Sequence, residues 1–354
     1  MSKNKIVSVA MSGGIDSAVA AFLLQQKGFS VRGATMKVCK RIMSDGSDAT
    51  LSDIDDAKKI CQTLGIQHTL YILEDEFKNT VVKSFIDTYL RGETPNPCVV
   101  CNNYLKFGKL LDLELSNGAD HIATGHYAKI EKDHNGRFLL KKAKDVKKDQ
   151  TYMLYGLSQD VLSKVLFPLG DLEKGEIREI AAQNGFVNAN KGDSQDICFV
   201  PDGNYAGFIE NELGYKYPEG NYVDEKGNIL GKHCGIIHYT IGQRKGLGIS
   251  MNRHIFVIDK DFRSNTVTLA DEDKLFKKRV VINGINLIPF DTFDGKIRVD
   301  AKIRYSQNAA SAYAEMTGEN EITLEFDTPQ RAPARGQSAV LYDGDVVIGG
   351  GIIR

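Results

Sequence analysis

Apolar and polar positions follow two different periods in residues 1–200. Short β-branched runs such as Ile6-Val7-Ser8-Val9-Ala10 alternate with segments whose apolar residues recur at helical spacing, such as Ala18-Val19-Ala20-Ala21-Phe22-Leu23-Leu24. Strands that alternate with helices are typical of an α/β fold with a doubly wound parallel sheet, which binds ligands at the carboxyl ends of its strands. We predict strands at 5–10, 30–38, 67–73 and 119–128, and helices at 18–24, 53–64, 77–91 and 176–184.

The pattern changes after residue 200. Residues 203–248 are rich in glycine and aromatic side chains and predict a small, mainly β central domain, in which 242–248 form a basic loop. From residue 274 onward, short alternating runs such as Ile297-Arg298-Val299-Asp300 are separated by turns, which predicts a C-terminal β-barrel. We therefore expect three domains, at 1–200, 201–273 and 274–354.

Composition narrows the class of protein. The 354 residues carry a net charge of −1, which argues against indiscriminate nucleic-acid binding, although basic residues gather at 137–148 and among 274–304. No apolar run approaches the roughly 20 residues that span a bilayer, and the start lacks a hydrophobic signal segment. We therefore expect a cytoplasmic protein without a membrane partner. In a reducing compartment, six cysteines favour catalytic or metal-binding roles over a disulfide framework.

The turn after the first strand has the composition of a phosphate loop, Ser12-Gly13-Gly14-Ile15-Asp16-Ser17. Two glycines let the backbone approach an anion, and the amides that begin the next helix point towards it. Asp16 would repel phosphate unless a cation lay between them, so we assign Asp16 to Mg²⁺. An ordinary strand–turn–helix corner is the alternative, and the absence of Gly-Lys-Ser/Thr excludes a Walker loop.

Two prolines precede a Cys-x-x-Cys pair in Pro95-Asn96-Pro97-Cys98-Val99-Val100-Cys101. Because prolines interrupt a helix, Cys98 and Cys101 are expected at the start of the following helix, where the helix N-terminus lowers the pKa of a thiol. Zinc is the alternative ligand, although no second Cys-x-x-Cys or Cys-x-x-His follows. Cys198 lies where the polar loop 192–196 enters an apolar strand, and by its spacing alone it is a small buried residue.

Three further candidates lie at the ends of predicted strands. Met36 either lines an adenine pocket or belongs to the core. Gly125 would let the backbone meet a nucleotide. His126 either donates to phosphate or RNA or is a structural histidine. The residues 39–52 between a predicted strand and helix are polar and predict a mobile loop.

Six motifs in this order closely resemble the bacterial tRNA-specific 2-thiouridylases, within the PP-loop ATP pyrophosphatase superfamily, and the match covers essentially the whole chain. The resemblance implies a PP-loop catalytic domain, adenine nucleotide alpha hydrolase-like, and an ATP-dependent enzyme that replaces the oxygen on carbon 2 of a wobble uridine by sulfur. The motifs are Ser12-Gly-Gly-Ile-Asp16-Ser17, Thr94-Pro-Asn-Pro-Cys98-Val-Val-Cys101-Asn102, Ala123-Thr-Gly-His126-Tyr127, Lys148-Asp-Gln150, Asp196-Ile-Cys198-Phe199 and Arg331-Ala-Pro-Ala-Arg-Gly-Gln337-Ser-Ala-Val.

The resemblance also implies roles for single residues. Cys101 matches the nucleophilic cysteine and Cys198 the cysteine that carries a persulfide. The ATP site matches Ala10, Met11, Ser12, Gly13, Gly14, Ile15, Asp16, Ser17, Met36 and Gly125. The segment that meets the target base matches Asn96, Pro97 and Cys98, and the positions that contact tRNA match His126, Lys148, Asp149, Gln150, Arg304, Tyr305 and Gln337.

This chemistry suits the residue types. Adenylation turns the carbon-2 oxygen of uracil into a good leaving group, AMP. A persulfide on Cys198 then attacks carbon 2 and Cys101 attacks the sulfur–sulfur bond, or Cys101 first releases hydrosulfide from Cys198; the sequence does not separate these routes. The expected cofactors are ATP and Mg²⁺. The expected partners are a tRNA with a wobble uridine and a sulfur relay from a cysteine desulfurase.

Several alternatives remain open at this point. Many family members carry Asp where this chain has Cys98, so Cys98, Cys101 and Cys198 could instead hold a [4Fe-4S] cluster that carries the sulfide. Other rivals are a PP-loop enzyme that adenylates a small molecule and a non-catalytic zinc-containing RNA-binding protein, whose zinc ligands would include Cys234. Cys39, Cys61 and otherwise Cys234 are treated as structural by default.

Overall fold

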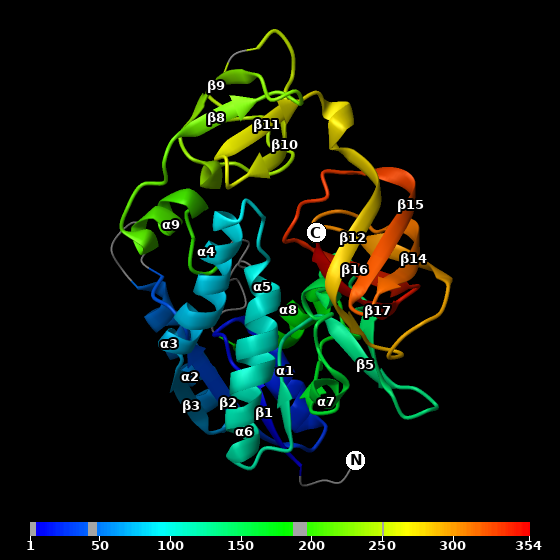
Figure 1. Ribbon diagram of the computed structural model, residues 1–354. Coiled ribbons are helices and arrows are strands. Elements are labelled where there is room, and N and C mark those ends of the chain that lie inside the picture. The colour runs from blue at the N-terminus through cyan, green and yellow to red at the C-terminus, as the bar shows by residue number, and fades with distance from the viewer. Residues whose placement is uncertain (1–4, 42–47, 187–196, 250) are drawn as a thin grey trace. The chain divides into compact units, whose positions relative to one another are not determined.

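The computed structural model describes residues 5–41, 48–186, 197–249 and 251–354 (Figure 1). Part of the predicted loop 39–52 and the polar loop 192–196 lie outside the described residues. The chain divides into two compact units that interleave along the sequence. The first unit comprises Met1–Val81, Cys98–Pro201 and Asp345–Ile348, and the second comprises Val82–Pro97, Asp202–Gly344 and Gly349–Arg354.

A five-stranded parallel sheet organises the first unit, in the order β3-β2-β1-β4-β7 (Figure 1). The pairing of Val7 with Val31 on one side and with His121 on the other puts β1 at the centre of the sheet. The parallel sheet confirms the predicted α/β class. Its strands are β1 Ile6–Ala10, β2 Ser30–Lys37, β3 His68–Ile72, β4 His121–Ala123 and β7 Val165–Leu166.

The helices of the first unit follow the predicted alternation, with different lengths. The helix predicted at 53–64 begins earlier, and the strand predicted at 119–128 is limited to β4, after which the antiparallel hairpin of β5 Ala128–Lys132 and β6 Phe138–Lys142 begins. The helices are α1 Ile15–Gln26, α2 Ala49–Thr63, α3 Glu74–Phe77, α5 Pro97–Cys101, α6 Leu111–Ser116, α7 Gln159–Leu162 and α8 Lys174–Gln183, with π-helical turns at Lys78–Val82 and Asn102–Leu110 and a 3-10 turn at Thr151–Met153.

Helix α1 is buried along most of its length because its small apolar side chains let it pack closely on the sheet. Ala18, Val19, Ala20 and Ala21 are fully buried together with Val7 and Val9 of β1. Alanine has the highest helix propensity and no side-chain entropy to lose, so the same residues that form the helix also allow the close approach. The loop between β1 and α1 therefore has a rigid support on both sides.

The second unit contains a small sheet and a barrel. The small sheet has the order β10-β11-β8-β9, with helix α9 Tyr205–Leu213 before it in the chain and helix α4 Lys83–Leu90 also in this unit. Its strands are β8 Gly220–Val223, β9 Ile229–His233, β10 Phe256–Asp261 and β11 Thr266–Ala270, and 3-10 turns lie at Ile236–His238 and Glu272–Leu275.

Six strands then close into a barrel. They pair in the order β12-β15-β14-β13-β16-β17, and β12 also pairs with β17, for example Ile282 with Ile353, which joins the two ends. Closure removes the unpaired strand edges of an open sheet. The predicted C-terminal barrel is confirmed, with β12 Phe276–Leu287, β13 Lys296–Lys302, β14 Ala310–Gly318, β15 Glu321–Arg331, β16 Ser338–Asp343 and β17 Val346–Ile353. In the described part of the chain, no helix has the length and apolar character needed to cross a membrane.

A buried ion pair connects the sheet of the first unit with α6. The guanidinium of Arg32 on β2 lies 2.7 Å from the carboxylate of Glu114, whose side chain is only 2% exposed. The same guanidinium donates to the backbone carbonyls of Glu114 and Asn117 at the end of α6, each at 2.9 Å. Arg32 thus satisfies helix carbonyls that have no partner within the helix, as well as a buried charge.

Replacement of Arg32 by alanine should strongly destabilise the first unit. The carboxylate of Glu114 would stay buried without its partner, which costs about 3–5 kcal/mol of unfolding free energy. The matched control is Lys164→Ala, which removes the pair with Asp160, whose side chain is 74% exposed. That change should cost about 0.5 kcal/mol or less. Urea unfolding followed by far-ultraviolet circular dichroism measures both, and equal losses would contradict the assignment.

Candidate active site

The loop between β1 and α1 is held by its own hydroxyl groups and by close backbone contact with α2. The Ser17 hydroxyl donates to the Gly14 carbonyl at 3.0 Å and accepts from the Ser12 amide at 3.2 Å. Gly13 has a φ of +76°, and a Cβ there would lie 2.3 Å from the Asp53 carbonyl oxygen of α2. Glycine is therefore required at position 13 by both the backbone angle and the space. Ser12 is exposed at the surface of the loop.

Asp16 in the first turn of α1 is bound by a lysine and a tyrosine. Lys174 Nζ lies 2.9 Å from each of the two carboxylate oxygens, and Tyr127 donates its hydroxyl to Oδ1 at 2.7 Å. Lys174 is nearly buried and is the first residue of α8, where Glu173 and Glu176 form a capping box. No local sequence pattern indicates Lys174 or the hydroxyl of Tyr127 as partners of Asp16. Tyr127 lies 111 positions and Lys174 lies 158 positions from Asp16 in the chain, and only the fold brings them together.

Gly125 follows β4 and lies directly against the start of α1. A Cβ at Gly125 would be 2.8 Å from the Asp16 carbonyl carbon and 2.9 Å from the Ser17 amide nitrogen. This glycine therefore allows the strand end and the loop to touch. Met36, near the end of β2, is half-buried and pairs in register with Tyr71 of β3. The predicted ATP-site residues thus lie at or near the carboxyl ends of β1, β2 and β4 and at the start of α1, as expected for a parallel sheet. They are Ala10 to Ser17, Met36 and Gly125.

The Cys-x-x-Cys pair lies on α5, which begins at Pro97 as predicted from the two prolines. Cys98 is exposed and Cys101 half-buried. Cys198 is also exposed and lies in a turn, and the next residue anchors this turn because the ring of Phe199 packs edge-on against Phe77 at 5.4 Å. Asp196 of the same motif lies outside the described residues.

Burial and one shared cation set the protonation of these three thiols. Burial raises the pKa of Cys101 to about 11, against the opposing charge of Lys106. Although part of Cys98 is exposed, protein atoms packed around its sulfur likewise raise its pKa, again opposed by Lys106. The lowered pKa expected from the helix N-terminus is therefore wrong, because loss of solvent around the sulfur outweighs it. Lys106 was missed, since a spacing of five residues from Cys101 does not indicate a shared face on an α-helix.

A fourth cysteine belongs to this cluster. The Cys198 thiol donates a hydrogen bond to Cys39, which raises the pKa of Cys198 and lowers that of Cys39. The default assignment of Cys39 as structural stays a prediction. The default fits Cys61, which is buried beneath Gly33 and whose pKa is raised to about 11 by that burial.

His126 forms a cluster with two aromatic rings. Its ring centroid is 5.7 Å from that of Phe107 and 5.9 Å from that of Phe167, and Nδ1 lies 2.6 Å from the Thr124 hydroxyl oxygen. Burial, together with the charge of Lys106, holds the pKa of His126 well below its usual range. The imidazole is therefore neutral at neutral pH, and it can contact RNA as a hydrogen-bonding and stacking group rather than as a cation.

The segment Lys148-Asp149-Gln150 is built into the loop after β6. Asp149 accepts from the Ala143 amide at 3.0 Å and from the Thr151 hydroxyl at 2.6 Å, and the Gln150 side chain accepts from the Tyr127 amide at 2.9 Å. These two side chains shape the loop next to Tyr127. Lys148 is half-buried.

In the second unit, Gln337 is joined to the predicted target-base segment. Its side-chain amide donates to the carbonyls of Thr94 at 3.2 Å and Pro95 at 2.8 Å. Asn96 is half-buried and Pro97 buried, and the chain passes to the first unit between Pro97 and Cys98. Gln337 and Pro95 belong to separate sequence motifs 242 positions apart, and the fold brings them into contact.

Arg304 and Tyr305 lie together at the end of the barrel strand β13. The Arg304 guanidinium donates to the carbonyls of Ile241 at 3.1 Å and Ala332 at 2.8 Å, so it links the barrel to the basic loop 242–248. Tyr305 is exposed, and Lys302 Nζ lies 5.1 Å from the centre of its ring. Of these two residues, Tyr305 presents the larger accessible surface.

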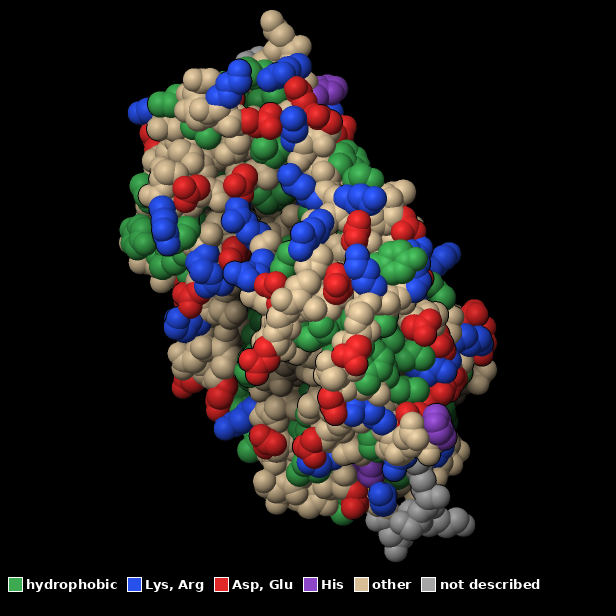
Figure 2. Space-filling model, turned by 45° about the vertical axis from the view of Figure 1, so that its right-hand side comes forward, with side chains coloured by type: hydrophobic (Ala, Val, Ile, Leu, Met, Phe, Trp, Pro, Cys, Tyr) green, Lys and Arg blue, Asp and Glu red, His purple; other side chains and the backbone are tan. Residues whose placement is uncertain are grey.

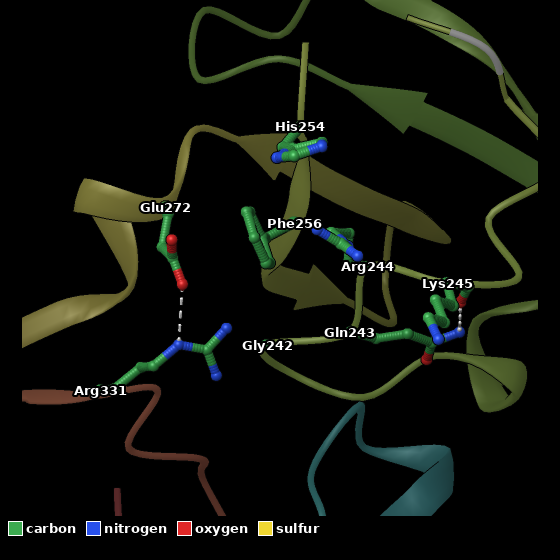
Figure 3. A pocket seen from close by; sticks show the side chains of 8 residues that line it. All are labelled: Gly242, Gln243, Arg244, Lys245, His254, Phe256, Glu272 and Arg331. Atoms are coloured by element: carbon green, nitrogen blue, oxygen red, sulfur yellow. Dashed lines mark hydrogen bonds and ion pairs between the residues drawn. The ribbon is translucent and has the colours of Figure 1, made fainter.

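The basic loop lines a cavity of about 570 Å³ in the second unit (Figure 3). Arg244 and Lys245 are exposed, and the Gln243 side chain donates to the Lys245 carbonyl at 3.0 Å. On the other side Arg331 lies 5.5 Å from the centre of the Phe256 ring and donates to Glu272 at 3.2 Å. Cationic side chains beside an aromatic face suit a phosphate and a stacked base.

Several other basic residues are neutralised by acidic neighbours. Lys141 pairs with Glu131 and Asp345, Lys144 with Glu176, and Arg298 with Asp327. Figure 2 shows Lys and Arg side chains intermixed with Asp and Glu on the visible face. The basic runs of the sequence are thus weaker anion-binding surfaces than their composition indicates.

Replacement of Gly125 by alanine should displace the nucleotide loop. The added methyl group overlaps backbone atoms of Asp16 and Ser17, so the affinity for ATP should fall at least about tenfold, because small misplacements in a binding site are costly. Gly175→Ala is the control, since this helical glycine of the same unit has open space around it. Titration calorimetry with ATP measures both variants, and unchanged affinity in Gly125→Ala would contradict the close contact.

Comparison with known proteins places the whole chain in one family. Residues 5–202 match the family model of the tRNA methyl transferase HUP domain, 206–271 the tRNA methyl transferase PRC-barrel domain, and 278–353 the aminomethyltransferase beta-barrel domain. The tRNA-specific 2-thiouridylase MnmA of Clostridioides difficile is 48% identical over 100% of this chain and 99% of its own. That of Acetivibrio thermocellus is 46% identical over 100% of both chains.

One solved structure with a weaker likeness is the tRNA thiolase NcsA from Methanococcus maripaludis with its [4Fe-4S] cluster. It is 20% identical over 59% of this chain and 67% of its own, with a TM-score of 0.37. This similarity is too low to carry over ligands. The two curated relatives cover nearly the whole chain at almost half identity, and the chain therefore belongs to the family of tRNA-specific 2-thiouridylases.

Proposed function

We propose that this protein thiolates carbon 2 of the wobble uridine of tRNA, with ATP as activator and a persulfide on Cys198 as the source of sulfur. The observation that supports this most is the cysteine cluster. The charge of Cys198 raises the pKa of Cys98 and of Cys101, and the charge of Lys106 lowers both. All three cysteines belong to the same unit as the candidate nucleotide loop. The alternative of an enzyme that adenylates a small molecule does not explain the cysteine cluster. The alternative of a zinc-containing RNA-binding protein does not explain the candidate nucleotide loop.

Adenylation would take place at the loop. The amides that begin α1 and the ammonium of Lys174 would stabilise the negative charge of the departing pyrophosphate. Both oxygens of Asp16 are already occupied by Lys174, and Oδ1 also by Tyr127, so Asp16 in this arrangement does not fit a Mg²⁺ ligand. Mg²⁺ remains the expected companion of ATP.

Sulfur transfer would follow at the cysteine cluster. The terminal sulfur of the Cys198 persulfide attacks carbon 2, AMP leaves with the former carbonyl oxygen, and a thiolate then breaks the sulfur–sulfur bond to leave the thiocarbonyl. The sequence resemblance assigns that thiolate to Cys101. Lys106 would favour it by opposing the effect of burial on the pKa. The sulfur would reach Cys198, which is exposed, from a relay that begins at a cysteine desulfurase.

An iron–sulfur route is less well supported by the side chains. Cys98, Cys101 and Cys198 supply the right atoms, but among the described residues no group of three or more His, Cys, Asp or Glu side chains is arranged to hold a metal ion. The donor set of the described residues therefore does not fit a cluster.

Recognition of tRNA would involve several surfaces. A wobble base must leave its stack to reach Cys198, and the segment Asn96-Pro97-Cys98, positioned by Gln337, is our candidate for its pocket. His126, whose neutral ring packs beside Phe107 and Phe167, could stack on a neighbouring nucleotide. The cavity beside Arg244 and Lys245 would bind the phosphate backbone. Lys148, Asp149, Gln150, Arg304 and Tyr305 remain candidates for further contacts.

Pyrophosphate release tests the proposed function. Purified protein should release pyrophosphate from ATP with an unmodified tRNA that has a wobble uridine, and not with the same tRNA that has a wobble cytidine. Cys198→Ser loaded with no sulfur should still release pyrophosphate but should form no thiouridine, because the adenylation step needs no thiol. Equal release with both tRNAs, or none with either under anaerobic reducing conditions, would overturn the proposal.

The contribution of the basic loop can be measured through salt dependence. Arg244→Ala and Lys245→Ala should each weaken tRNA binding and reduce the slope of log affinity against log salt by about 1, because each phosphate contact releases counterions. Lys296→Ala is the control, since its ammonium is neutralised by Glu325 at 3.4 Å and Glu315 at 3.7 Å. A slope that changes equally in all three variants would contradict this assignment.

A further inference from the structure

The cavity beside the basic loop is formed by two segments that lie far apart in the sequence. One segment is the loop that begins at Gly242, and the other is the end of β15, where Arg331 lies (Figure 3). Both belong to the second unit. Within the motif that begins at Arg331, only Gln337 has a role among the proposed contacts. The volume of about 570 Å³ lies in the range of sites that hold a whole small molecule, whereas a single phosphate contact needs no cavity.

The guanidinium of Arg331 is held on one face and on one edge. Its central carbon lies 5.5 Å from the centre of the Phe256 ring, and its Nε donates to Glu272 at 3.2 Å. The next residue, Ala332, has a φ of +53°, which is uncommon for a residue other than glycine, and its amide donates to the Leu275 carbonyl at 2.8 Å. The side chain of Arg331 is nevertheless 38% exposed. An ordered guanidinium therefore presents part of its surface to the cavity.

The basic loop is fixed where it meets Arg331. Gly242 has a φ of +90°, and a Cβ there would lie 3.2 Å from the Cβ of Ala332 and 3.5 Å from a terminal nitrogen of Arg331. Glycine thus allows the loop to approach this side chain. The Gly242 amide donates to the Val257 carbonyl at 2.8 Å, and the Val257 amide donates to the Gln243 carbonyl at 2.9 Å. Because the loop is ordered before a ligand binds, binding costs less conformational entropy.

The cavity offers charge and a flat surface at different side chains. Arg244 and Lys245 are exposed, and within the part of the chain that the structure describes neither is paired with an acidic side chain. Arg331 is paired with Glu272, so it adds little net charge. Free cations attract a phosphate, and RNA bases stack on the planes of arginine guanidinium groups. The two features together suit a nucleotide.

We propose that this cavity binds one nucleotide of the tRNA other than the wobble uridine, with its base stacked on Arg331 and its phosphate at Arg244 and Lys245. The proposal rests on the proposed function for its ligand, a tRNA. None of the described residues that line the cavity is a cysteine, so the nucleotide held here is not the one that receives sulfur. A free nucleotide has the same base and phosphate, and the two sources are compared in the test.

Replacement of arginine by lysine separates stacking from charge. Arg331→Lys keeps the positive charge and loses the planar surface, so tRNA affinity should fall about tenfold while the slope of log affinity against log salt stays that of the wild type. The matched control is Arg298→Lys in the same barrel, whose guanidinium also packs on an aromatic ring, 4.8 Å from the centre of Tyr313, away from the residues that line the cavity. This control should bind tRNA as the wild type does.

Filter binding over a series of salt concentrations measures both variants. Unchanged affinity in Arg331→Lys, or an equal loss in Arg298→Lys, would overturn the stacking role of Arg331. A reduced salt slope in Arg331→Lys would do the same, because it would show a charge contact in place of stacking.

Ultraviolet cross-linking of the wild-type complex locates the nucleotide whatever the stability of the variants. Peptides that contain Lys245 or Arg331 should carry a nucleotide adduct, and reverse-transcription stops should place it outside the wobble position. An adduct at the wobble position, or none on these peptides, would overturn the proposal. Titration with uridine and cytidine monophosphates, without tRNA, is the second arm. Binding that is lost in Arg331→Lys, with no adduct from tRNA in the cavity, would overturn tRNA as the source.

A single turnover of the wild type with ATP and the uridine tRNA separates this proposal from the proposed function. Adducts in the cavity and weaker binding by Arg331→Lys, without thiouridine in the turnover, would refute the proposed function and leave the nucleotide site standing. Thiouridine formed by a protein that gives no adducts in the cavity would refute the nucleotide site alone.

Discussion

The arrangement of the first unit depends on the carboxylate of Asp16. It accepts from Lys174 and Tyr127, and so joins the start of α1 to the start of α8 and to the residue before β5. Such a partly buried charge is stable only while its partners stay in place. The same turn of α1 touches Gly125 after β4. Charge pairing and backbone contact therefore fix the loop after β1, which is the candidate nucleotide loop.

In the cysteine cluster, burial and nearby charges shift the pKa values of chemically identical side chains by different amounts. Burial keeps Cys98 and Cys101 as thiols, and Lys106 limits this effect without reversing it. A hydrogen bond with Cys198 and the charge of Arg41 lower the pKa of Cys39. Cysteines of one unit thus differ in how readily they form the thiolate, which is the reactive species in sulfur exchange.

The sequence was a good guide where a pattern is local. The apolar run of β1, the alanine-rich α1 and the alternating strands of the barrel are each specified by neighbours within a few residues, and each was predicted. The order of motifs was enough to place the chain in its family. Element boundaries were less accurate, as with the strand predicted at 119–128, because Thr124 to Tyr127 carry apolar and polar residues like a strand but bend towards Asp16.

By itself, then, the sequence determined the fold class and the family, and it singled out the loop after β1 and three cysteines as candidates, because those depend on residue types at short spacings. Only the tertiary structure decided that Lys174 and Tyr127 bind Asp16, and that the charge of Lys106 opposes the effect of burial on the pKa of Cys101. It also reversed the expected pKa of Cys101. Contacts between residues far apart in the chain, and the loss of solvent around a sulfur atom, arise only when the elements pack together, and no local pattern encodes them.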